Sequence, residues 1–369
     1  MSKMQINGFQ LFCTMVLFMF GTAIFLDLGS GAKQDAWIVT LISPIIGLLL
    51  FIVYLQLHKR YPQLTFTEYA RKIWGKYIGS IIGYLYIIYF IYIASRVLRD
   101  FEELVISSVY NKTSIITIGI CMMFVLIYTV NFGIEVFTRA ACICFFVAVF
   151  TLVIIDILYI IGDLIHLDNV RPILAEGWKP VIKEIIPLNI TVPYGELVIF
   201  SMIFPYLNKQ TNLLKVGSMA VVFVGLFLTL NTLLLICILG TDVLSRSAFP
   251  ALTAVSYINI AGFIQRIDTF IILLVVILAF IKIAAFFLCA VIGMNNLFKL
   301  KPNLISTYFA GSIIFLSSIL IAPGYQSHLD EGLKIVPYLL HVPFQIVIPL
   351  LLLLTAFIRG RGKAKQGTG

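Results

Sequence analysis

The stretch "VPYGELVIF", residues 192–200, places a proline, a glycine and a carboxylate inside an otherwise apolar run. The 369-residue chain is 61% hydrophobic and only 12% charged, with a mean hydropathy of +1.05. That is more apolar surface than a water-facing globule of this length buries, so we predict a membrane protein. An acidic residue within an apolar run of such a protein needs a physical reason.

Runs of ~20 apolar residues, the length that a helix needs to cross a ~30 Å hydrocarbon core, recur about ten times. They lie at roughly 7–26, 36–57, 77–105, 114–132, 138–161, 185–206, 213–240, 268–297, 304–322 and 337–358. The polar connections between them are too short to form a separate soluble core. We therefore predict an all-α polytopic membrane protein, with a single transmembrane domain at 1–360 and a short basic cytoplasmic tail at 361–369.

The distribution of Lys and Arg predicts the orientation of the chain. With a cytoplasmic N-terminus, the inner loops carry about twice as many of these residues as the outer loops. Both termini are then cytoplasmic. Attraction to anionic lipid in the bilayer accounts for the net charge of +9, so we expect no nucleic-acid partner.

The side chains most often used in catalysis form no recognisable pattern. The cysteines lie within apolar spans, where cysteine behaves as a small hydrophobic residue. The histidines lie at or near span ends without partner spacing, and the sequence has neither a nucleotide-binding glycine motif nor a nucleophile–base set. We therefore expect no enzyme activity, no cofactor and no metal site.

The first and sixth spans are both interrupted. Gly21 and Thr22 interrupt the first, and Pro193 and Gly195 interrupt the sixth. Matched interruptions in two halves of a chain are typical of inverted-repeat transporters, whose substrate site lies where the broken helices meet. We predict a five-plus-five inverted repeat with broken helices 1 and 6, the LeuT-like fold. The alternative is a proline kink with a packing glycine.

The breaks also predict where a ligand binds. Repeat one is expected at about 7–161 and repeat two at about 185–358. A break within the membrane frees backbone groups that lipid cannot satisfy, so a ligand, water or protein must bond them. The predicted ligand-binding residues at the two breaks are Gly21, Thr22, Ala23, Pro193, Tyr194, Gly195 and Glu196.

Glu196 directly follows the second break. It would therefore stand at the start of the second half-helix, where free N–H groups and the helix dipole favour a negative charge. Two roles are open. The carboxylate caps the half-helix, or it is the direct partner of a ligand ammonium or a cation.

Lys282 is the other charge deep in an apolar span. It lies about 21 Å along its helix from both Asp268 and Asn296, too far for its side chain to reach water. We expect it to face the bundle interior. It either forms a buried ion pair between two helices, or its ammonium takes the place of a bound cation between the eighth and first spans and makes the protein independent of sodium.

The outer end of the third span is rich in charge. Arg96 with Asp100, and Arg99 with Glu102 or Glu103, have the spacing of neighbours on one helix face, so this end is expected to neutralise itself. Tyr92, one turn inward from Arg96, is a candidate lining residue of the ligand cavity, although the tyrosines around it are more typical of packing.

Four segments of the sequence form an ordered set of motifs. They are "AKQDAW" at 32–37, "RYPQLTFTEYARKIWGKYIG" at 60–79, "PYGE" at 193–196, and "YINIAGFIQRIDTF" at 257–270 followed by Lys282. Together they resemble the spore germination permeases, the polytopic B subunits of endospore nutrient receptors. The resemblance covers roughly residues 5–360. Both the order of the four motifs and the spacing between them agree with the family. That family belongs to the amino acid/polyamine/organocation transporter superfamily, which implies the same five-plus-five fold.

The resemblance also implies a function. Such a protein recognises a small germinant, an amino acid, sugar or nucleoside, in the spore inner membrane. It works with an A subunit and a lipoprotein C subunit, and binding triggers ion release. Because a fold does not fix a function, an ion-coupled amino-acid transporter and a structural subunit that binds nothing remain alternatives.

Overall fold

Helices make up most of the described chain. The computed structural model describes residues 5–25, 29–108, 112–259, 268–300 and 304–366. The elements of the first half are α1 (Gly8–Ala23), η1 (Ser30–Asp35), α2 (Ala36–Arg60), α3 (Phe66–Trp74), α4 (Lys76–Ser108), α5 (Ile115–Asn131), α6 (Gly133–Ile161) and η2 (Leu167–Val170). Those of the second half are α7 (Trp178–Glu184), η3 (Ile185–Tyr194), η4 (Gly195–Met202), η5 (Phe204–Tyr206), α8 (Leu213–Arg246), α9 (Pro250–Ser256), α10 (Asp268–Phe298), α11 (Leu304–Leu320), α12 (Tyr325–Asp330), η6 (Glu331–Ile335), η7 (Pro337–Val347) and α13 (Ile348–Gln366).

The apolar helices account for the spans expected from the sequence. Within the described residues, 7 helices are long and apolar enough to cross a membrane. An eighth span is formed if α11 and the segment Tyr325–Ile335, bent against each other by 111°, are taken together. The two shorter apolar helices, α1 and α5, coincide with the first and fourth predicted spans. The repeat boundaries at about 7–161 and 185–358 stay a prediction.

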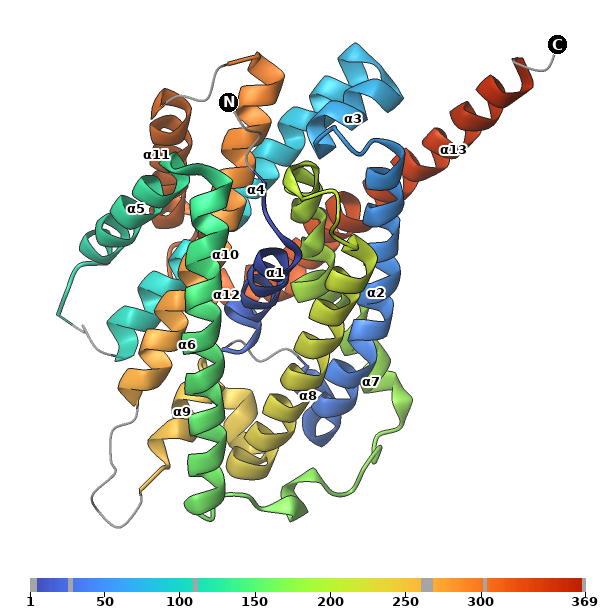
Figure 1. Ribbon diagram of the computed structural model, residues 1–369. Coiled ribbons are helices and arrows are strands. Elements are labelled where there is room, and N and C mark those ends of the chain that lie inside the picture. The colour runs from blue at the N-terminus through green and yellow to red at the C-terminus, as the bar shows by residue number, and fades with distance from the viewer. Residues whose placement is uncertain (1–4, 26–28, 109–111, 260–267, 301–303, 367–369) are drawn as a thin grey trace.

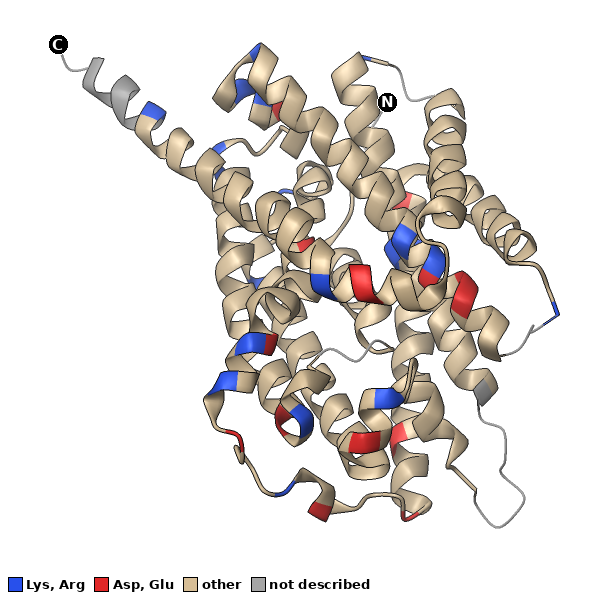
Figure 2. Ribbon diagram, turned by 180° about the vertical axis from the view of Figure 1, so that it is seen from behind, with Lys and Arg blue, Asp and Glu red and all other residues tan. Residues whose placement is uncertain are grey.

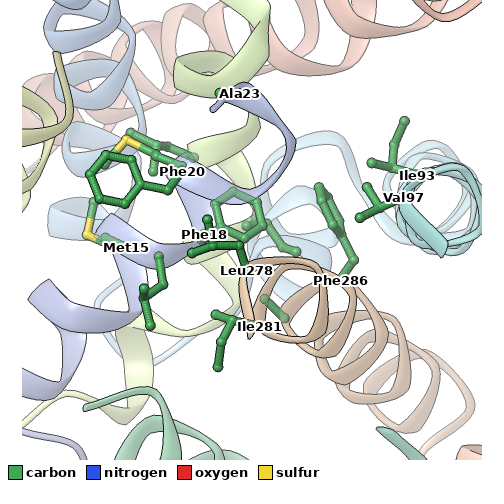
Figure 3. Packing of buried hydrophobic residues seen from close by; sticks show 14 of the residues in the cluster. Met15, Phe18, Phe20, Ala23, Ile93, Val97, Leu278, Ile281 and Phe286 are labelled. Carbon is green, nitrogen blue, oxygen red and sulfur yellow. The ribbon is translucent and has the colours of Figure 1, made fainter. Parts of the chain in front are cut away.

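Helix α1 lies in the middle of the bundle (Figure 1). It packs against α6, α8 and α10, and most of its residues are buried. A helix that is apolar on every side is stable only when other helices surround it. Figure 3 shows its inner face, where Phe18 lies beside Leu278 and Phe286 of α10. The rings of Phe18 and Phe286 are 5.2 Å apart.

Both predicted breaks are present in the backbone. Gly21 leaves the helical conformation with φ 20° and ψ −112°, and α1 ends two residues later. In the sixth span, Val192 is extended, with φ −117° and ψ 117°. The chain then continues through Pro193 into the tighter 3₁₀ helix η4. Helix α1 is capped at its start, where the Asn7 side chain accepts the Gln10 backbone N–H at 2.8 Å.

The ends of the bundle differ in the connections that they carry. Helix α3 and the far end of α13 lie at one end, and the long connection from α6 to α7 lies at the other (Figure 1). Long stretches of the helices between the two ends carry no charge (Figure 2). The connection between α2 and α3, next to the predicted inner-side residues Lys59 and Arg60, lies at the end at which α13 leaves the bundle (Figure 1).

Candidate functional site at the two helix breaks

Lys282 and Glu196 form an ion pair inside the bundle. The Nζ atom of Lys282, on α10, lies 2.6 Å from Oε2 of Glu196, in η4. Only 1% and 3% of the two side chains are exposed. Burying either charge alone is costly, so each side chain depends on the other to stay ionised in the interior. The prediction that Lys282 faces the bundle interior is confirmed.

The same lysine also contacts the break in α1. Its Nζ lies 3.3 Å from the Thr22 hydroxyl and 5.6 Å from the centre of the Phe18 ring. A Cβ atom on Gly21 would collide with the methylene groups of Lys282. Three separate segments, α1, η4 and α10, therefore converge on one ammonium group, and glycine is needed at position 21 because the lysine passes directly over its backbone.

Of the two roles expected for Glu196, the structure favours the one that uses its charge. Glu196 does lie in the first turn of η4. Its carboxylate turns toward Lys282, and we find no described backbone N–H that donates to it. The cap interpretation is therefore not supported by the described contacts. The cation that faces the carboxylate is the protein's own ammonium group.

A small cavity adjoins the ion pair. Its volume is ≈ 60 Å³, and Glu196 and Thr22 form part of its wall. Its charged and polar lining includes Arg96, Asp100 and His341, and the rest is mainly aliphatic. The complete lining is Thr22, Ile93, Arg96, Val97, Asp100, Leu188, Val192, Glu196, Leu329, Gly332, Leu333, Val336 and His341. Polar groups on an apolar wall are the usual composition of a site for a small ligand.

A polar network from η7 supports the second break, and sequence analysis missed it. The Tyr89 hydroxyl lies 2.7 Å from Nδ1 of His341 and accepts the Gln345 amide N–H at 2.7 Å. The Tyr54 hydroxyl lies 2.7 Å from the Gln345 carbonyl oxygen and 3.1 Å from that of Gly195. His341, which shows no partner spacing in the sequence, is thus bonded through tertiary contacts. Two polar side chains one helical turn apart in an otherwise apolar span were the signal that could have found the network.

The outer end of α4 is bonded differently from the prediction. Arg99 and Glu103 do pair, at 2.7 Å. Arg96 instead donates to the His328 carbonyl oxygen at 2.5 Å and lies 3.6 Å from a Glu331 oxygen. Local spacing failed here because η6 and α12 pack onto this face of α4 and supply stronger partners.

The remaining members of this outer cluster also bond across helices. Asp100 lies 3.0 Å from Nε2 of His328, a tertiary contact that spacing along the sequence does not indicate. Glu102 is fully buried and accepts the Ser318 hydroxyl at 3.2 Å. Tyr92 is not part of the cavity wall. Its hydroxyl lies 3.2 Å from Arg96, which does line the cavity.

The remaining residues predicted to bind a ligand do not line the ≈ 60 Å³ cavity. Ala23, Pro193 and Tyr194 line a separate cavity of ≈ 20 Å³. Gly195 lies against Gln345, whose amide oxygen would collide with a Cβ at that position. Thr22 and Glu196 therefore line the cavity with the charged groups, whereas Gly21 lines a further cavity of ≈ 20 Å³ together with Thr22. Tyr92, Gly195 and Lys282 line none of these three cavities.

The four segments that carry the family resemblance can be compared with known proteins. Residues 5–325 match the family model described as spore germination protein. The chain belongs to this family. This spore germination protein is 37% identical over 366 residues to spore germination protein KB of Bacillus subtilis (strain 168), covering 99% of this chain and 98% of that protein. Of the four segments, 257–270 lies partly outside the described residues.

Solved structures show the fold. Mhp1, a nucleobase-cation-symport-1 family transporter in a closed conformation with bromovinylhydantoin bound, matches with a TM-score of 0.63 at 14% identity, covering 97% of this chain and 91% of that one. MhsT in complex with L-phenylalanine matches with a TM-score of 0.59 at 13% identity, covering 95% and 87%. The LeuT-like fold predicted for this spore germination protein is confirmed.

The ion pair predicts a non-additive mutant cycle. Glu196→Gln or Lys282→Met alone leaves one buried charge unpaired, which should lower the free energy of unfolding by ~3–5 kcal/mol. The double variant leaves neither charge and should be more stable than either single variant. Thermal unfolding of the purified proteins in detergent measures the difference. Additive losses in the double variant would contradict the pairing.

Gly21 predicts a steric effect that a second glycine can control. Gly21→Ala should abolish the nutrient response of spores, because its Cβ displaces the Lys282 side chain. Gly177 also has a positive φ, of +71°, but no atom lies within 4 Å of where its Cβ would be. Gly177→Ala is therefore the control for backbone strain alone, and spores that carry it should respond normally. Protein level is measured by immunoblot for both. A normal response from Gly21→Ala would remove the first break from the site.

Proposed function

We propose that this protein is the B subunit of a nutrient germinant receptor and that it binds a small germinant beside the two helix breaks. Family membership supports a role in germination, and the transporter fold supports a ligand site where the broken helices meet. The observation that carries the proposal is the ≈ 60 Å³ cavity next to the Glu196–Lys282 pair. The expected ligand class is an amino acid, a sugar or a nucleoside.

The size of the cavity indicates how the binding of a germinant is coupled to a conformational change. At roughly 10–15 Å³ for each water molecule, the ≈ 60 Å³ cavity has room for only a few waters, which is less than a sugar or a nucleoside fills. A germinant of that size binds only when the surrounding helices separate. A ligand that prefers the open form shifts the population toward it, and that shift is what a neighbouring subunit can sense.

The position of Lys282 determines the proposed sodium independence of the protein. Its ammonium lies among α1, η4 and α10, and bonds to Thr22 and Glu196 as a bound cation would. We infer that Lys282 takes the place of a coupling sodium ion. The site is then assembled before any ligand or ion arrives.

The proposed partners are an A subunit and a lipoprotein C subunit in the spore inner membrane, with both termini cytoplasmic. The positive charge of the loops at the end where α13 leaves the bundle supports that orientation. A single cysteine placed in the tail at 361–369 should be protected from a membrane-impermeant maleimide in intact cells. Labelling of that cysteine would reverse the topology.

The competing function is an ion-coupled amino-acid transporter, which the likeness to Mhp1 and MhsT favours at the level of fold alone. Uptake of labelled nutrient into proteoliposomes separates the two functions. A receptor subunit shows saturable binding without accumulation. A transporter shows accumulation that a dissipated ion gradient abolishes.

Filling the cavity tests the site itself. Ile93 lines the cavity on α4, whereas Ile88 on the same helix is 62% exposed on the outer surface. Ile93→Phe should raise the nutrient concentration for half-maximal germination by ~10-fold or more, which corresponds to 1.4 kcal/mol of lost binding. Ile88→Phe, the matched control, should leave it unchanged. Equal responses at equal protein levels would place the ligand elsewhere.

The role assigned to Lys282 predicts sodium independence. Replacing sodium by potassium in the germination medium should not alter the response of the unmodified protein. Lys282→Met should fail to respond, and added sodium should not restore it. A sodium requirement in the unmodified protein would overturn this role of the lysine, even if the cavity still bound nutrient.

A further inference from the structure

A large apolar hollow lies among α4, α5, α6 and α10. Its volume is ≈ 750 Å³, compared with ≈ 60 Å³ for the cavity at the breaks. Phe101, Met122, Val276 and Phe280 are typical of its walls, which are apolar along most of their extent. Helix α5 lies at the edge of the bundle (Figure 1). The hollow is therefore formed where a peripheral helix meets the central ones.

One end of the hollow is polar. Thr113 lies two residues before the start of α5, and Thr117 lies in the first turn of that helix. Thr269 lies in the first turn of α10, and all three threonines line the hollow. The hollow thus combines a long apolar wall with hydroxyl groups at one end, which is the polarity profile of an amphiphile. Outside the lining, the exposed Lys112 directly precedes Thr113, and in the sequence Asp268 directly precedes Thr269.

Two kinds of apolar group can fill such a hollow in a membrane, a helix of a partner protein and a lipid acyl chain. The volume of the hollow distinguishes between them. A helix with its side chains is ~10–12 Å across, so 750 Å³ corresponds to only ~7–10 Å of helix, less than two turns. A partner helix would therefore fit only as a fragment. An acyl chain is thin enough to lie along the hollow for its whole length. It also needs no hydrogen-bond partner at this depth.

We propose that the hollow is a phospholipid site, in which one acyl chain lies among α4, α5, α6 and α10 and the anionic headgroup lies at Lys112. The hydroxyl groups of Thr113 and Thr269 are placed to donate to the phosphate oxygens. A single lysine at a membrane surface favours anionic over neutral headgroups by about fivefold.

The lipid would contact the helix that carries the central ion pair. Phe280 lines the hollow and Lys282, two residues later, faces Glu196. Two residues correspond to ~200° around a helix, so these side chains lie on opposite faces of α10. The acyl chain therefore forms part of the packing behind Lys282, although the lipid site does not depend on the proposed germinant function.

Native mass spectrometry of the purified full-length protein tests the site. After mild delipidation in detergent, the unmodified protein should retain phospholipid, with anionic species enriched about fivefold over the membrane from which it was purified. Val276→Trp fills the hollow and should lose most of this lipid. Val153→Trp, on the outer surface of α6 at 45% exposure, is the matched control and should retain it.

Two further variants keep the test decisive. Cys121→Phe fills the hollow from α5 and should lose lipid in the same way even if Val276→Trp fails to fold. Lys112→Gln should retain the total amount of lipid but lose the anionic preference. Equal retention by Cys121→Phe and Val153→Trp would overturn the proposal. So would loss of co-purifying receptor subunits with lipid unchanged, since the hollow would then be a protein interface.

Discussion

The ion pair between Glu196 and Lys282 is the contact on which the centre of this protein depends. Neither charge can be left alone in an interior where both side chains are almost completely buried. Each therefore determines the position of the helix that carries it. Because Lys282 also bonds to Thr22, the pair joins α1, η4 and α10 at the two places where regular helical hydrogen bonding is interrupted.

The surrounding contacts follow from that constraint. The extended backbone at Val192 exposes carbonyl groups that lipid cannot bond, and the Tyr54 hydroxyl bonds the Gly195 carbonyl beside it. Tyr54 also bonds the backbone of Gln345, which connects η7 to the same break. The ≈ 60 Å³ cavity lies between the second break and the cluster of Arg96 and its partners, with Val192, Glu196 and Arg96 in its wall. A change in either set of bonds alters the space available to a ligand.

The sequence predicted the positions at which helix-breaking or charged residues interrupt an apolar membrane span. Gly21, Pro193, Glu196 and Lys282 are exceptions in apolar runs, so each required a break, a cavity or a partner. It did not predict which groups would pair. The Arg96–Asp100 spacing was a local signal, whereas the observed partners, Glu331 and His328, come from helices that fold back from the other end of the chain. Such pairings depend on tertiary packing, which spacing along one helix does not encode.

The central claim is that the cavity beside the Glu196–Lys282 pair, with Glu196 in its wall, is the ligand site. An experimental density map of the receptor with its nutrient bound tests this most directly. The account predicts non-protein density in an enlarged cavity bounded by Thr22, Glu196 and His341, with Lys282 still in contact with Glu196. Nutrient density at another place, with this cavity still closed, would contradict it.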